Sequence, residues 1–172
     1  MLPNIDLRIA NMVKALEQVI LPALPRDQRL ARDQAMLVAG HLRMLGDQWK
    51  AALRYEQISL DALAGLALDL IPAAPAALGH RLAEALTAAQ GCDRESVTAL
   101  EQANIALGHA VDAVILVGEA HTPLPQSSID AILDYALRHA RRERTWFKAN
   151  SLDPDQGELP DIAEMIDAAS HA

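Results

Sequence analysis

The amino-acid sequence predicts an all-α protein, an antiparallel helical bundle of five to seven helices. Apolar side chains recur at alternating steps of three and four along most of the chain, which places them on one face of an α-helix. Hydrophobic residues make up 51% of the 172 residues and aromatic residues only 3%. Alanine and leucine dominate the apolar share, and both favour helix over strand.

Two prolines divide the first part of the chain. Pro22 ends a helix that we expect over Ile5 to Leu21, and Pro25 opens the next, expected from Arg26 to Gln57. The main apolar row of this second helix comprises Ala31, Ala35, Val38, Leu42, Leu45, Trp49 and Ala52. A second row on its flank comprises Leu30, Leu37, His41 and Met44. Apolar residues on two sides predict one contact with the bundle and another with a partner helix or subunit.

Later segments continue the pattern. We expect a shorter helix that begins near Ser59 or Asp61 and ends at Ile71, another from Ala76 to Gln90, and long helices over 95–119 and 127–150. The inward row of the 95–119 helix comprises Val97, Leu100, Asn104, Leu107, Val111, Val114 and Gly118. The inward row of the 127–150 helix comprises Ile129, Leu133, Ala136, Ala140 and Phe147.

We expect one domain over residues 1–152 and an acidic tail over 153–172, whose short helix packs on the bundle or on a neighbouring subunit. The net charge of −8 opposes attraction to nucleic acid and to anionic membranes, so neither is expected as a partner. The amino terminus lacks the pattern of a secretory signal, and no uncharged apolar stretch approaches 20 residues. Cys92 is the only cysteine, so we expect a reducing, cytoplasmic location.

Sequence motifs for catalysis are absent. No glutamate lies three residues before a histidine, and no histidine pair has the spacing of the HExxH zinc motif. The chain has no Gly-x-Ser-x-Gly elbow and neither of the common glycine-rich phosphate loops. We therefore predict no catalytic residue, no metal and no cofactor, and the sequence favours a protein that is not an enzyme.

Five residues remain as candidates for ligand binding. His80 with Glu84, and His109 with Asp112, place an imidazole and a carboxylate on one helix face, which suits metal ligation or acid–base chemistry. The competing interpretation, a solvated or interface histidine, is favoured for both. Asn104 occupies a core-type position, where a buried amide either bonds to a neighbouring helix or lines a ligand pocket.

A basic run near the end of the 127–150 helix is the candidate anion site, with Arg138, Arg141, Arg142 and Trp146 as its residues. Arginines beside an aromatic ring suit contact with phosphate or nucleotide. Cations near a helix C-terminus also complement the helix dipole, and the acidic tail supplies counter-charges. This structural role is the favoured interpretation.

The function that remains is a non-catalytic helical interaction or accessory protein that binds another protein. We expect a homodimer formed by the flank of Leu30, Leu37 and Met44 or by the face of Ile105 and Leu116. The alternative is a small-molecule-binding or metal-dependent bundle with its site near His80 and His109.

Overall fold

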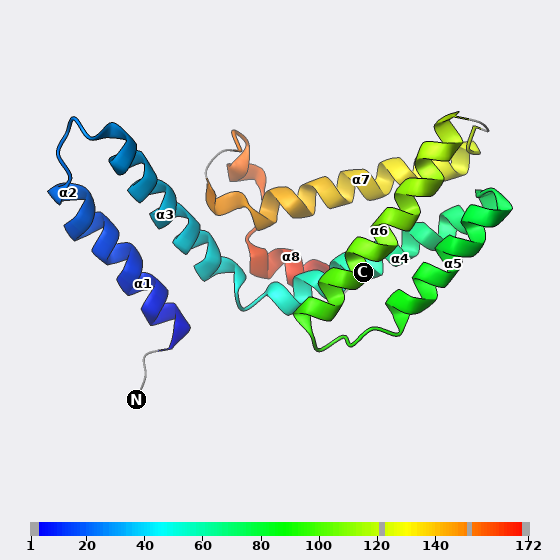
Figure 1. Ribbon diagram of the computed structural model, residues 1–172, viewed down its shortest axis with the longest axis horizontal. Coiled ribbons are helices and arrows are strands. Elements are labelled where there is room, and N and C mark those ends of the chain that lie inside the picture. The colour runs from blue at the N-terminus through cyan, green and yellow to red at the C-terminus, as the bar shows by residue number, and fades with distance from the viewer. Residues whose placement is uncertain (1–3, 121–122, 151–152, 170–172) are drawn as a thin grey trace. The chain divides into compact units, whose positions relative to one another are not determined.

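The computed structural model describes residues 4–120, 123–150 and 153–169 (Figure 1). The elements are α1 (Ile5–Ala15), a π-helical turn η1 (Leu16–Ile20), α2 (Leu21–Ala23), α3 (Arg29–Gln48), α4 (Ala52–Leu70), the 3-10 turn η2 (Ile71–Ala73), α5 (Ala76–Gln90), α6 (Val97–Ala120), α7 (Gln126–Trp146), the 3-10 turns η3 (Lys148–Asn150) and η4 (Gln156–Glu158), and α8 (Ile162–Ala169). These residues form helices and turns without a strand, so the predicted all-α helical bundle is confirmed.

The chain divides into two compact units. The N-terminal unit comprises residues 1–51 and 143–165, and the central unit comprises residues 52–142 and 166–172. The expected domain over 1–152, with a tail over 153–172 that packs on it or on a neighbouring subunit, stays a prediction; in the structure, residues 153–165 belong to the same unit as α1 and α3. The contacts responsible include the Lys148 ammonium, which donates to the carbonyl oxygen of Leu159 at 2.8 Å.

The core of the central unit lies among α4, α5 and α6, which pack on one another. Leu100, Leu107 and Val114 are fully buried and Val111 nearly so, so these members of the row predicted for α6 face the core, whereas the surroundings of Gly118 lie outside the described residues. The bounds expected for α5 agree with the structure, and those of α6 agree within two residues. Each of these helices has one dominant apolar face, and burial of that face determines its orientation.

The expected helix from Arg26 to Gln57 is wrong, because the chain turns between α3 and α4 at residues 49–51. α4 instead continues through Ser59 and Asp61, where we expected a new helix to begin. Long-range contacts hold this turn: the Trp49 indole donates to Asp6 Oδ1 at 2.9 Å, and the Gln48 amide donates to the carbonyl oxygen of Trp146 at 2.8 Å. Tertiary contacts therefore override a local sequence that favours helix.

In the N-terminal unit, α1 and α3 form an antiparallel hairpin (Figure 1). Ile9 and Ala39 are its buried apolar side chains, and Ile9 Cγ2 packs against Gly46. The row predicted to be inward on α3 is only partly so, because Val38 and Leu45 remain about half exposed. α3 thus turns its small residues toward α1, which permits close approach of the two helices.

The inward row predicted for α7 is wrong. Its five members, Ile129, Leu133, Ala136, Ala140 and Phe147, are all exposed. The most deeply buried side chains of α7 are the polar Ser128, Arg142 and Thr145, and beside them Ala131, Ile132 and Tyr135 are partly buried against the core. Part of this polar face is satisfied internally, since the Tyr135 and His139 rings stack and a guanidinium nitrogen of Arg142 lies 3.0 Å from His139 Nδ1.

Candidate functional site

A small pocket in the central unit lies between α5 and α6 and has a volume of about 220 Å³. Its lining residues are Leu78, Arg81, Ala85, Ala106, His109, Ala110 and Ala113. The floor is apolar because alanine side chains supply most of it, and Arg81 and His109 supply the polar groups. This arrangement suits a short apolar group that carries a negative charge.

The other histidine-site candidates are not part of this pocket. His80 Nδ1 lies 3.4 Å from Glu84 Oε1 on the surface of α5, and both side chains are largely exposed. Asp112 is exposed on α6 and does not line the pocket. Within the described ranges, no group of three or more His, Cys, Asp or Glu residues is placed to hold a metal ion.

Asn104 connects two helices of the central unit. Its side-chain amide on α6 donates to the backbone carbonyl of Glu56 on α4 at 3.2 Å and to the Glu56 carboxylate at 2.9 Å. The residue is half-buried and is not among the residues that line the α5–α6 pocket. Its contacts are those of a helix-to-helix bond, the first of the two roles expected from the sequence.

The basic residues at the end of α7 do not converge on one cavity. Arg138 forms an ion pair with Asp134 one turn earlier, and Arg142 is buried beside His139. Arg141 is exposed, whereas Trp146 is half-buried and its carbonyl accepts the bond from Gln48. None of these four residues lines the pocket between α5 and α6 or the larger pocket of the N-terminal unit around Lys148.

The acidic tail neutralises part of this basic run. The Arg144 guanidinium binds both carboxylate oxygens of Asp153, at 2.6 and 3.1 Å. This hydrogen bond lowers the pKa of Asp153 below its usual range and raises the pKa of Arg144. The charges near the C-terminus of α7 therefore hold residues of the tail within the N-terminal unit.

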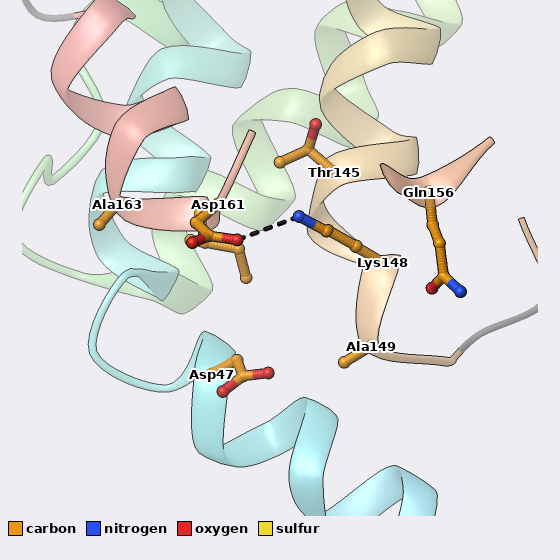
Figure 2. A pocket seen from close by; sticks show the side chains of 8 residues that line it. Asp47, Thr145, Lys148, Ala149, Gln156, Asp161 and Ala163 are labelled. Atoms are coloured by element: carbon orange, nitrogen blue, oxygen red, sulfur yellow. Dashed lines mark hydrogen bonds and ion pairs between the residues drawn. The ribbon is translucent and has the colours of Figure 1, made fainter. Parts of the chain in front are cut away.

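A larger pocket of about 500 Å³ lies in the N-terminal unit (Figure 2). Its lining residues are Asp47, Thr145, Lys148, Ala149, Gln156, Asp161, Ile162 and Ala163. Figure 2 shows the Lys148 side chain directed at Asp161, whose carboxylate accepts from its ammonium at 3.0 Å. Lys148 also donates to the carbonyl oxygen of Leu159, so this lysine is held by the tail and is a poor binding group for an external anion.

The α1–α3 hairpin exposes many large apolar side chains. Large hydrophobic side chains of the α1–α3 hairpin are exposed over much of their area, and we call them the hairpin surface. They are Ile5, Leu7, Met12, Val19, Ile20, Leu30, Met36, Leu37, Val38 and Leu45. Among them, Leu30 and Leu37 belong to the flank that the sequence singled out. An apolar surface of this kind is typical of a protein-binding site.

Sequence reasoning missed two features of these sites. Arg81, which shares the pocket with His109, stands on α5 with no motif to distinguish it. Lys148 follows the basic run in the sequence, and only the fold shows that it binds the tail. A spacing rule could not find either, because the partners of both residues lie on other elements.

Comparison of the chain with protein-family models, curated proteins and solved structures finds no match in any of the three. None of the helices in the described part of the chain is long and apolar enough to span a membrane.

Proposed function

We propose that this chain is a non-catalytic helical interaction protein that acts as a homodimer, with the hairpin surface as its interface. The observation that carries the proposal is the balance of apolar residues in the hairpin. Ten large apolar side chains are exposed there, whereas the buried apolar side chains of α1 and α3 are Ile9 and Ala39. A pair of helices with so small an internal core is expected to be covered by further helices.

The spacing of the exposed residues favours helices as the covering element. Ile5, Met12 and Val19 follow one another at intervals of seven, and so do Leu30, Leu37 and the half-buried Met44. Heptad rows are typical of side chains that insert between those of a neighbouring helix. The hairpin surface therefore suits another pair of helices better than a flat or extended partner.

The two heptad rows supply part of the apolar area that a stable dimer needs. At about 25 cal/mol per Å², the 1.5–3 kcal/mol gained on burying one large apolar side chain corresponds to about 60–120 Å². The five exposed members of the rows, about half exposed, then offer roughly 150–300 Å² per copy. A standard interface buries about 800 Å² per partner, of which about 65% is apolar in homodimers, or roughly 500 Å².

The charge of the hairpin is compatible with a second copy as the occupant. Residues 1–51 contain seven Lys or Arg and five Asp or Glu, a formal charge of +2, which leaves −10 on the remainder of the −8 chain. Two hairpins can thus approach with little mutual repulsion, and together they supply the four helices of a closed, two-fold symmetric bundle. A cytoplasmic location for this dimer is supported by the single cysteine.

Native mass spectrometry of the intact protein tests the proposal. We expect a mass of two 18.6 kDa chains for the unaltered protein and one chain for Leu37→Lys, because a dimer would bury the introduced ammonium. Leu68→Lys is the matched control: Leu68 is 56% exposed, close to the 53% of Leu37, but lies in the central unit. It should remain dimeric. A monomeric unaltered protein at micromolar concentration would refute the homodimer.

The same spectrum addresses the alternative function, small-molecule binding. The pocket between α5 and α6 with His109 and Arg81 supports that alternative. A bound small molecule would appear as added mass, and loss of that mass in His109→Ala would favour ligand binding over the interaction role. A metal ion lost in the same variant would favour the metal-dependent form.

A further inference from the structure

The outer face of α7 carries an apolar row with no cover. Ile129, Leu133 and Leu137 are 37%, 62% and 72% exposed, and Ala136 and Ala140 in the same row are also exposed. These five residues lie within a sector of about 100° at 100° per residue. From Ile129 to Ala140 the row extends over three turns, about 16 Å at 1.5 Å per residue.

The core side of α7 does not explain this row. Toward the rest of the chain, the helix turns Ala131, Ile132 and Tyr135, which pack against the core, together with Ser128, His139 and Arg142. An amphipathic helix normally buries its apolar stripe and exposes its polar face. α7 buries one apolar stripe in this way, so the row from Ile129 to Ala140 is a second apolar stripe that its packing on the core leaves exposed. The steps of four, three and four from Ile129 to Ala140 are those of a helix that packs on another helix.

Charge along α7 is polarised. Asp130 and Asp134 are the charged residues from 126 to 137, whereas residues 138–146 contain four arginines and one glutamate. Asp130 and Arg141 lie on the same side of the apolar row, about 100° and 120° around the helix from Ile129. Residues on the same side of such rows face each other when two like helices pair antiparallel. A pair centred near Ala136 therefore places Asp130 of each copy opposite Arg141 of the other.

We propose that α7 pairs antiparallel with α7 of a second copy, through this row and these charges. Alanines at positions 136 and 140 permit the short interaxial distance, near 8 Å, of closely packed helices. Only three large side chains contribute, so the contact falls in the small class below about 1,200 Å² and depends on protein concentration. The contact goes beyond the proposed hairpin dimer and rests on a different surface. Together, the two contacts would assemble more than two copies.

Sedimentation equilibrium of the full chain over a wide concentration range tests the proposal. The Leu37→Lys variant isolates the α7 contact by removing the hairpin contact. We expect this variant to be monomeric when dilute and dimeric when concentrated. Adding Leu133→Lys should weaken that association at least about tenfold, because a charge would replace an apolar contact. Adding Leu68→Lys, the control outside both surfaces, should leave it unchanged. Far-UV circular dichroism checks that each variant is folded.

Charge reversal separates the paired arrangement from an effect on the helix dipole, which the same polarity also complements. Asp130→Arg and Arg141→Asp should each weaken the association, and the two together should restore it. The dipole alone predicts no restoration.

Each outcome decides one of the two contacts. A Leu37→Lys variant that stays monomeric at every concentration, or a dimer indifferent to Leu133→Lys, would overturn the α7 pairing and leave the hairpin proposal intact. Dimerisation that Leu37→Lys leaves unchanged but Leu133→Lys abolishes would establish the α7 pairing and refute the hairpin interface.

Discussion

Replacing Asn104 by alanine tests whether this asparagine is structural. The substitution removes two hydrogen bonds from α6 to Glu56, one to its backbone carbonyl at 3.2 Å and one to its carboxylate at 2.9 Å. A neutral hydrogen bond contributes about 1 kcal/mol and one to a charged group about 1.5–3 kcal/mol. Because Asn104 is only half-buried, we expect the lower part of the sum, a loss of about 2 kcal/mol.

Thermal and urea unfolding followed by far-UV circular dichroism measures this loss. Both residues belong to the central unit, whose size corresponds to about 4–8 °C per kcal/mol, so the melting temperature should fall by about 8–16 °C. Gln102→Ala, an exposed change two residues earlier on α6, should stay within about 0.5 kcal/mol of the unaltered protein.

A double-mutant cycle with Glu56→Ala assigns the loss to this pair. We expect the second substitution to cost less in the presence of Asn104→Ala than alone. Equal stability of the Asn104→Ala and Gln102→Ala variants would refute the structural role.

Two further predictions concern the core and the response to acid. Leu107→Ala should lower the free energy of unfolding by about 2–5 kcal/mol, because Leu107 is fully buried. Leu116→Ala on the exposed side of α6 should lower it far less. If urea unfolding gave similar losses of stability for the two variants, the buried face of α6 would be misassigned. Hydrogen bonds from Lys50 and then Trp49 lower the pKa of Asp6, and the bond from Arg144 lowers the pKa of Asp153. The two ionised carboxylates therefore stabilise the fold above the unfolded pKa of about 3.9, and this stabilisation is lost as the pH falls from there through the folded pKa. Both tryptophans lie in the N-terminal unit, so their fluorescence should report its loss of structure in acid, and Asp6→Asn should reduce that dependence on pH; an unchanged acid transition in this variant would contradict the assignment.

Much of the central unit could be predicted from the sequence. α5 and α6 were located closely because their apolar residues fall on one dominant face, and burying that face leaves only one orientation. An asparagine directly before α1 favours an N-cap, and the Asn4 side chain accepts the amide hydrogen of Leu7 at 2.9 Å. Local pattern and tertiary contact agree at all these positions.

The turn between α3 and α4 could not be predicted. Residues 49–51 contain neither proline nor glycine, and the turn depends on bonds from Trp49 to Asp6 and from Gln48 to Trp146. The separation of these partners along the chain leaves no local signal. For the same reason, only the structure shows that Lys148 binds the tail through the carbonyl oxygen of Leu159.

The two helices whose faces were misjudged, α3 and α7, are also those with apolar rows exposed. Hydrophobic periodicity in a sequence reflects every surface that is buried when the protein works, including surfaces buried by another chain. Burial within one chain reflects only its own core. Where the two disagree, as at Val38 on α3 and Leu133 on α7, the interfaces that we propose would supply the missing burial. The helices that the sequence oriented wrongly, α3 and α7, are thus the ones that carry the two interfaces we propose.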